Sequence, residues 1–266
     1  MRNLTELRTH FETLLLQTDG GKPFVHKQKG VISLYLNSSG VQSKMRQEVP
    51  DELVLGYTHT MMGFLLFNTS PEKIAMIGLG GGSLAKYCYR YLPDSKIVVI
   101  ENDERVLELR DGFYVPRNDQ RFQVILGDGA EFMKSPPNKF DILLIDGFDC
   151  IGQPAQLCSR SFYDDCYESL SSDGIVVVNL LGADPGKLAS IERIRDSFGG
   201  AAIVVNAIDS TNKIVFACKG MALDLPDYVL RGRLNSLSCD HPVKLNPTVQ
   251  RILLERRLNM VAAMNS

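Results

Sequence analysis

Residues Ile74–Leu84 read I-A-M-I-G-L-G-G-G-S-L, an apolar run that breaks into glycines and then continues as helix-like sequence. The run Ile74–Ile77 predicts a buried strand, and Ser83–Tyr89 predicts the helix that follows it. Glycines allow the turn between them to adopt positive φ and to approach a ligand closely, while the helix N-terminus offers free N–H groups. The stretch therefore predicts a nucleotide-binding turn, although glycine clusters also occur in plain tight turns.

A second apolar run, Lys96–Ile100, ends in Glu101. An acidic side chain at this point of an α/β unit can accept hydrogen bonds from both ribose hydroxyls of a nucleoside. The glycine loop has the spacing G-x-G-x-G, with glycines at Gly78, Gly80 and Gly82. The dinucleotide fingerprint needs its third glycine where Ser83 stands. The spacing therefore favours a ligand of the S-adenosylmethionine type over NAD.

Composition indicates a globular protein with room for one main core. The chain has 266 residues, 44% of them hydrophobic, which suits one α/β domain with an added small lobe. Its formal charge of -2 and dispersed basic residues predict no nucleic-acid partner. The six cysteines form no C-x-x-C pair and have no histidine spacing suited to zinc, so we expect reduced thiols and no metal site. Without a signal-peptide pattern or a membrane-length apolar run, we expect a cytoplasmic protein with no membrane partner.

The residues before the glycine loop predict a small lobe. Apolar positions at helical spacing predict a short amphipathic helix over Leu4–Gln17. Short alternating segments within Lys22–Arg46, separated by glycine-containing turns, predict β-hairpin strands. Pro50, followed by two acidic residues, predicts the start of a helix that continues to Phe67. We therefore expect residues 1–49 to form a small N-terminal helix and β-hairpin lobe, and residues 50–266 to form the adenosyl-ligand-binding catalytic domain.

After the glycine loop, apolar strand-like runs alternate with helical segments, which is typical of a parallel sheet covered on both faces. The later runs are residues 122–126, 140–145 and 175–180. Asp128 follows the first of these runs, and Asp146 and Asp149 follow the second. Ligands bind outside the carboxyl ends of strands in open α/β sheets, so we expect an acidic crevice there.

The last two strand-like runs decide the type of sheet. Residues 201–208 and 213–218 are separated by only four residues, Asp209–Asn212. Four residues cannot hold a crossover helix, so these two strands must pair antiparallel. The expected α/β fold is thus a seven-stranded Rossmann-like sheet with a reversed last strand, the S-adenosylmethionine methyltransferase type. Helices are predicted to follow at residues 226–237 and 246–263.

Several different short motifs follow one another along the chain at characteristic spacings. They are Val41-Gln42, the glycine loop, Ile100–Asp103, Gly127–Gly129, Asp146-x-x-Asp149, and Pro154–Leu157 leading into Phe162-Tyr163. Together they resemble the polyamine aminopropyltransferases, the spermidine synthase family, over roughly residues 40–220. The resemblance implies that the thioadenosine part of a sulfonium donor is surrounded by the glycine loop and by Gln42, Glu101, Asp128, Gly129 and Pro154. It also implies Asp146 as the proton acceptor, Asp149 and Tyr57 as residues that hold the amine, and a homodimer.

The chemistry of this family suits carboxylates at strand ends. A neutral amine displaces the aminopropyl group from a sulfonium, so the leaving thioether needs no acid, but the incoming ammonium must lose a proton. A carboxylate beside the amine can accept that proton. Two carboxylates three residues apart, Asp146 and Asp149, also attract a polycationic substrate. In the alternative interpretation these two residues cap the next turn, and Tyr57 is an interior aromatic of a helix.

Departures from the family pattern lie on the polyamine side. The fourth position of the family's glycine loop is an aspartate that holds a substrate amine, and Gly81 stands there instead. The His or Gln that follows the family tyrosine is Thr58, with His59 one residue later, and the downstream tyrosine-containing segment has no match. Our main hypothesis is aminopropyl transfer from decarboxylated S-adenosylmethionine to an amine acceptor. A methyltransferase that uses S-adenosylmethionine, or a non-catalytic binder of an adenosyl ligand, are the alternatives.

Overall fold

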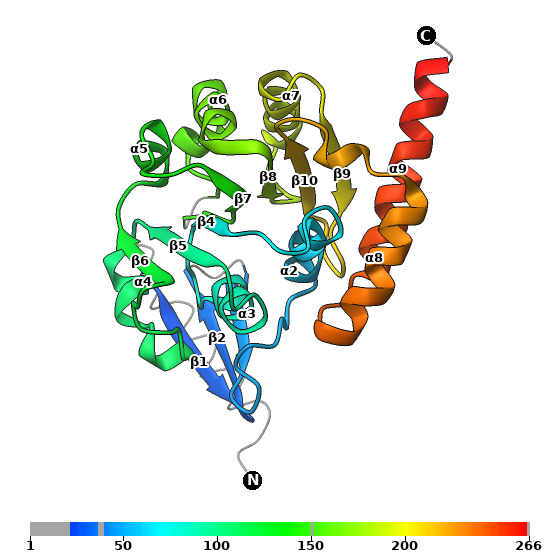
Figure 1. Cartoon of the computed structure of the whole chain (residues 1–266). Coiled ribbons are helices and arrows are strands. Elements are labelled where there is room, and N and C mark those ends of the chain that lie inside the picture. Colours follow the sequence, from blue (N-terminus) through cyan, green and yellow to red (C-terminus); the bar gives the residue numbers. More distant parts are fainter. Residues whose placement is uncertain (1–21, 37–39, 150–151, 265–266) are drawn as a thin grey trace.

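Figure 1 shows the computed structural model of the chain, which describes residues 22–36, 40–149 and 152–264. The helix expected over Leu4–Gln17 lies outside the described residues. The strands of the central sheet are β4 (Lys73–Ile77), β5 (Lys96–Glu101), β6 (Phe122–Leu126), β7 (Phe140–Ile145), β8 (Leu170–Leu180), β9 (Ala202–Asn206) and β10 (Lys213–Cys218). A smaller sheet consists of β1 (Phe24–Gln28), β2 (Val31–Tyr35) and β3 (Ser43–Arg46).

The central sheet has the strand order β6-β5-β4-β7-β8-β10-β9. The neighbours from β6 to β8 pair in parallel, whereas β10 pairs antiparallel with both β8 and β9. The predicted seven-stranded sheet with a reversed last strand is therefore confirmed. Since β10 is inserted between β8 and β9, the hairpin turn that joins β9 to β10 lies at the same edge of the sheet as the carboxyl end of β8.

Helices cover both faces of the central sheet. They are α2 (Gly56–Met61), α3 (Ser83–Tyr91), α4 (Glu104–Glu108), α5 (Gly129–Lys134), α6 (Arg160–Ser169), α7 (Lys187–Ser197), α8 (Asp227–Asp240) and α9 (Asn246–Met264), with 3₁₀ turns η1 (Met62–Leu66), η2 (Asp111–Phe113), η3 (Ala155–Cys158) and η4 (Ala222–Asp224). Figure 1 shows α5, α6 and α7 over one face, with α2, α3 and the small sheet on the other. Among these described helices, none combines the length and apolar character needed to cross a bilayer.

Successive residues of β4 point into two separate apolar clusters, as strand geometry requires. Ile74 and Met76 belong to the cluster that includes α3, η1, α8 and α9, while Ala75 and Ile77 belong to the cluster beneath α5, α6 and α7. The central strands are thus buried on both faces, which explains their nearly continuous apolar sequences.

The predicted β-hairpin strands are present as the antiparallel sheet β1-β2-β3. A buried lysine joins this sheet to the rest of the molecule. Lys86 of α3 donates from Nζ to the Phe113 carbonyl at 2.8 Å and to Met45 Sδ of β3 at 2.9 Å. Burial lowers the pKa of Lys86 to about 8. The small sheet therefore lies against the start of α3, next to the glycine loop.

The helix predicted to begin at Pro50 is wrong in its first part. Residues 47–52 form turns, α2 begins only at Gly56, and the segment tightens to 3₁₀ geometry at Met62. The reason is a set of short-range contacts, because Arg46 forms a two-pronged ion pair with Glu52 and a bridge with Val49 that hold the chain in a turn. Proline followed by acids suits such a turn as well as a helix start.

Candidate active site

A cavity of about 790 Å³ opens at the carboxyl ends of the parallel strands. Its walls come from the glycine loop after β4, the end of β5, the turn after β6, the loop after β7 and the β9–β10 turn. The site residues predicted from sequence that line it are Gln42, Tyr57, Gly78, Gly80, Glu101, Asp128, Gly129, Asp146, Asp149 and Pro154. Gly82 lies behind the cavity wall. Within the described residues no group of three His, Cys, Asp or Glu side chains is arranged to hold a metal ion.

The glycine loop is packed too tightly for side chains at three of its positions, and at two of them, Gly78 and Gly82, the backbone also has positive φ. Gly78 has φ of 95°, and a Cβ there would lie 2.3 Å from the carbonyl oxygen of Asp146. Gly82 has φ of 67° at the start of α3, and its Cβ would lie 2.6 Å from Cγ2 of Val115. Both conformations favour glycine. The loop's backbone therefore lies directly against the segment that carries Asp146.

Glu101 is held at the end of β5 by backbone N–H groups. Its Oε2 accepts hydrogen bonds from Leu79 at 2.8 Å and Gly80 at 3.5 Å, and its Oε1 accepts one from Asp103 at 3.0 Å. The residue is only 7% exposed but lines the cavity. Two carboxylate oxygens offer about four lone-pair positions, so these three bonds leave about one position for a ligand hydroxyl. The contacts fix the carboxylate against the glycine loop.

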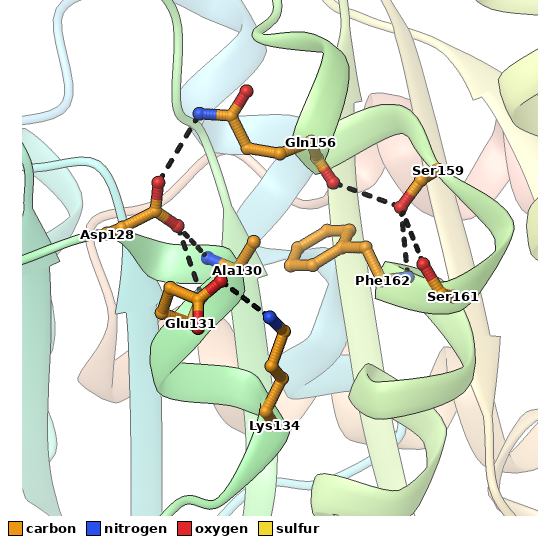
Figure 2. Close-up of polar contacts among 8 residues, drawn as sticks. All are labelled: Asp128, Ala130, Glu131, Lys134, Gln156, Ser159, Ser161 and Phe162. Carbon is orange, nitrogen blue, oxygen red and sulfur yellow. Dashed lines mark hydrogen bonds and ion pairs between the residues drawn. The ribbon is translucent and has the colours of Figure 1, made fainter.

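Asp128 has a structural contact as well as a place in the cavity. Its Oδ1 accepts hydrogen bonds from the N–H groups of Ala130 and Glu131 at 2.7 and 3.1 Å, so it is the N-cap of α5. Figure 2 shows its other oxygen directed towards the amide of Gln156, whose Nε2 donates to Oδ2 at 3.4 Å. Gln156 is itself held by Ser159, which donates from Oγ to its carbonyl at 3.2 Å. The cap therefore presents one carboxylate oxygen to the cavity.

Asp146 lies at the end of β7 and receives two hydrogen bonds. Tyr57 of α2 donates to its Oδ2 at 3.0 Å, and Asn179 of β8 donates from Nδ2 to its Oδ1 at 2.8 Å. Burial raises the pKa of this carboxyl, while the bonds from Asn179 and Tyr57 lower it. Burial of the Tyr57 hydroxyl and the nearby charge of Asp146 hold the pKa of Tyr57 well above its ordinary value. A carboxyl poised in this way can accept a proton from a group in the cavity.

Asp149 stands at the exposed rim of the same loop. Its Oδ1 accepts from the N–H of Gly152 at 2.9 Å, and its own N–H donates to the Gly152 carbonyl at 2.8 Å. The turn-capping interpretation thus describes a contact that Asp149 makes, whereas Asp146 bonds to side chains from two other elements. Both carboxylates line the cavity.

The structure explains why Gly81 carries no side chain. A Cβ at this position would lie 2.5 Å from Oγ of Ser43 and 2.8 Å from Cδ1 of Phe113. Ser43 is buried and its hydroxyl shares a hydrogen bond of 3.2 Å with that of Ser83. A pair of neutral hydroxyls therefore stands beside the position where the resembling family carries an aspartate.

Two polar residues of the site were not predicted. Asn179 is a buried polar side chain within the apolar run Ile175–Leu180, a sequence signal that could have drawn attention to it. Asn212 lies in the β9–β10 turn, where asparagine is ordinary, so its sequence context carried no such signal. Asn212 donates from Nδ2 to Oδ1 of Asn179 at 2.9 Å. The two residues connect the hairpin to Asp146.

The strand order and the position of the cavity define the Rossmann-like fold of the S-adenosylmethionine methyltransferase type. A family model for the spermine/spermidine synthase domain matches residues 54–196. A polyamine aminopropyltransferase of Neisseria meningitidis is 36% identical over 80% of this chain and 82% of its own length. One from Chromobacterium violaceum is 35% identical over 73% of this chain and 74% of its own. The chain belongs to the spermine/spermidine synthase family.

Solved structures agree on the fold. A probable spermidine synthase from Corynebacterium glutamicum has a TM-score of 0.65 at 17% identity, covering 83% of this chain and 85% of that one. A spermidine synthase in complex with the transition-state analogue AdoDATO has a TM-score of 0.60 at 20% identity, covering 89% and 86%. Human methyltransferase-like protein 13 with SAH has a TM-score of 0.61 at 20% identity, covering 74% and 93%. Since both classes share the fold, it is the family membership that supports aminopropyl transfer over the methyltransferase and non-catalytic alternatives.

Proposed function

We propose that the cavity transfers the aminopropyl group of decarboxylated S-adenosylmethionine to an amine of a polyamine-type acceptor, with Asp146 as the proton acceptor. The observation that carries this proposal is the Asp146 carboxylate, which is half-buried in the cavity wall and oriented by Tyr57 and Asn179. Membership of the spermine/spermidine synthase family supplies the class of reaction.

The donor's thioadenosine part fits the side of the cavity built by the glycine loop. Glu101 has about one lone-pair position left for a ribose hydroxyl. The open carboxylate oxygen of Asp128 offers an acceptor for an exocyclic amine. Gly129 lines the cavity, and its lack of a side chain lets the start of α5 pack on Ile77, because a Cβ there would lie 2.5 Å from Cγ2 of Ile77. In this proposal the rest of the nucleoside is enclosed by Gln42 of the 1–49 lobe, by Gly78 and Gly80, and by Pro154, while Gly82 supports the loop from behind the cavity wall.

The reaction needs one base and no acid. The nitrogen lone pair of the acceptor forms a bond to the aminopropyl carbon as the bond from that carbon to the sulfonium breaks, and the sulfur leaves as a neutral thioether. The nitrogen then carries an extra proton, which passes to Asp146. Tyr57 stabilises the carboxylate before transfer through its hydrogen bond to Oδ2. Asp149, at the rim, is placed to attract the distal ammonium of the acceptor.

A panel experiment tests this function. The protein is incubated with decarboxylated S-adenosylmethionine or S-adenosylmethionine and a set of diamines, and products are identified by mass spectrometry. We expect aminopropylated amine and methylthioadenosine from the decarboxylated donor only. Methylated products, or no turnover with any donor, would contradict the proposal.

Asp146→Asn should keep the shape of the site and lower turnover by about 10²–10⁴-fold, the usual range for a positioned general base. Because burial raises the pKa of Asp146, the parent should lose activity as the pH falls through that raised value. The loss in the variant should shrink towards about pH 10, where an alkylamine deprotonates by itself. Asp149→Asn is the matched control, and we expect it to raise the acceptor KM with a smaller effect on kcat. Near-parent activity of Asp146→Asn at neutral pH would remove Asp146 from its role.

The assembly is the part of the proposal that the family resemblance alone supports. We infer a homodimer in the cytoplasm, as the resemblance implies. Sedimentation at several protein concentrations checks the dimer, and a single monomeric species would contradict it.

A further inference from the structure

A chain of side-chain amides ends on the Asp146 carboxylate and begins at a backbone N–H. Gly182 donates from its N–H to Oδ1 of Asn212 at 3.2 Å. Asn212 donates from Nδ2 to Oδ1 of Asn179 at 2.9 Å, and Asn179 donates from Nδ2 to Oδ1 of Asp146 at 2.8 Å. Asn179 is only 2% exposed, so it has few other partners to choose from. We call these residues the amide relay.

The direction of the amide relay is set by its first member. An amide side chain can be turned so that its oxygen and nitrogen exchange places, and neighbouring groups decide which way it points. A backbone N–H can only donate, so Asn212 must turn its oxygen towards Gly182 and its nitrogen towards Asn179. Asn179 must then turn its own nitrogen towards Asp146. Every bond of the amide relay therefore points at the carboxylate.

We propose that Asn212 and Asn179 are positioning residues that close Oδ1 of Asp146 to protons and direct the proton of the attacking amine to Oδ2. This inference rests on the proposed function for the identity of the proton donor. The amine N–H bond breaks, its electron pair stays on nitrogen, and the O–H bond forms at Oδ2, where Tyr57 is the neighbour. No other reactant is needed.

The fold holds the hairpin end of the amide relay from two sides. A Cβ on Gly182 would lie 2.1 Å from Oγ1 of Thr211, and a Cβ on Gly56 would lie 2.1 Å from the Ile208 carbonyl oxygen. Ile208 also donates from its N–H to Oγ1 of Thr60 at 3.0 Å. The β9–β10 turn is thus wedged between the loop after β8 and the helix that carries Tyr57. Both groups that bond to Asp146 are supported by the same turn.

The amide relay also withholds a stabilising hydrogen bond from the protonated, neutral form of Asp146. If Asn179 were free to turn, its oxygen could accept a hydrogen bond from a proton on Oδ1 and so stabilise the protonated acid. With its direction fixed, the protonated acid gains no such bond, whereas the carboxylate keeps one. Tyr57 contacts the carboxyl directly, and among the described residues the other titratable groups around the same cavity are Glu101, Asp103, Glu104, Arg105, Asp128, Asp149 and Asp209.

The test measures the protonation of Asp146 itself, so it does not depend on turnover. The protein is labelled with ¹³C at the aspartate carboxyl, and the Asp146 signal is assigned by its absence in Asp146→Asn and followed against pH. Asn212→Leu frees Asn179 without adding charge, and Asn212→Asp forces Asn179 to turn its oxygen towards Asp146. We expect the titration of Asp146 to move to higher pH in both variants, and further in Asn212→Asp.

Asn206→Asp is the matched control, since it makes the same change at an exposed position of the same hairpin, where the Asn206 side chain accepts a hydrogen bond from Lys213 Nζ. It should leave the Asp146 titration in place. If the Asp146 titration moved only in Asn212→Asp, added charge alone would explain the effect, and the proposal would be overturned. An unchanged Asp146 titration in both variants would also overturn it. If one variant does not fold, Asn212→Ser makes the same test, because serine is too short to reach both Gly182 and Asn179.

Activity provides a second readout. Relative to the parent, kcat/KM of Asn212→Leu should fall about tenfold on the acidic side of the profile and recover towards the parent at alkaline pH, as expected when a hydrogen bond to a charged group is lost. A purely structural defect would lower activity equally at all pH values. If no variant and no parent turns over, the proposed function fails while the titration still decides the amide relay.

Discussion

Gly81 shows how a single position can be closed to a side chain by its neighbours. The Ser43 hydroxyl and the Phe113 ring occupy the space that a Cβ would need. The hydroxyls of Ser43 and Ser83 are bonded to each other, so the cavity wall carries a neutral polar pair at this point. A charged anchor cannot be restored there without removing what fills the space.

Gly81→Asp is expected to destabilise the fold by about 1–3 kcal/mol, because it overpacks the contact with Ser43. Ser43→Ala removes the nearer atom, so the double variant should recover part of that loss. Urea unfolding of the four proteins in the cycle measures the coupling. Strictly additive effects would show that Ser43 is not the obstacle.

At this scale the sequence predicted those site residues that stand at strand ends. Glu101, Asp128 and Asp146 follow apolar runs, and parallel strands bring such positions together. Asn179 and Asn212 were not found, since their contact depends on the pairing of two strands far apart in sequence. The obstruction beside Gly81 likewise depends on where β3 lies in space, which no local pattern records.

Among the elements, the β9–β10 hairpin has the largest influence on the site. Its short connection made it the best predicted element, because a four-residue turn leaves no alternative to antiparallel pairing. The segment after Pro50 was predicted poorly, because proline followed by acids suits a turn as well as a helix start, and the Arg46–Glu52 ion pair holds the chain in the turn. Local sequence signals predict an element correctly where the length of a connection excludes the alternatives. They fail where the same residues suit two local structures and side-chain contacts decide between them.

Gly182→Ala should displace the hairpin, since its Cβ would overlap Thr211. We expect lower kcat with nearly unchanged affinity for methylthioadenosine, measured by calorimetry beside the kinetic assay. Gly232→Ala is the control: Gly232 lies in α8 with nothing within 4 Å of its Cβ position. That change should stabilise the protein by about 0.5–1 kcal/mol and leave kcat alone. A Gly182→Ala enzyme with parent kcat would show that the turn does not support the base.

Considered as a whole, the molecule concentrates negative charge at its cavity. The formal charge of the chain is only -2. The cavity nevertheless collects acidic side chains from four segments, and its one cationic side chain among the described lining residues is Arg105, which pairs with Asp103. Low-dielectric walls focus such a field and raise the local concentration of a polycation.

Salt should therefore act on one substrate and spare the other. Raising the ionic strength from about 0.05 M to about 0.5 M shortens the screening length severalfold, so the acceptor KM should rise by a few fold. Binding of methylthioadenosine, which is neutral, should change little, and it serves as the control. Equal sensitivity of both ligands to salt would show that the acidic lining does not attract the acceptor.

The place of the hairpin in the chain has a consequence for biosynthesis and for divergence. The glycine loop, Glu101 and Asp128 all emerge from the ribosome before β8, whereas Asn212 emerges after every other group of the site. Because a domain generally folds as a unit, the site is complete only after this last segment has been synthesised. Asn212 reaches Asp146 through Asn179. Substitutions in residues 207–212 can therefore alter the proton-accepting side during evolution while the residues of the donor side stay unchanged.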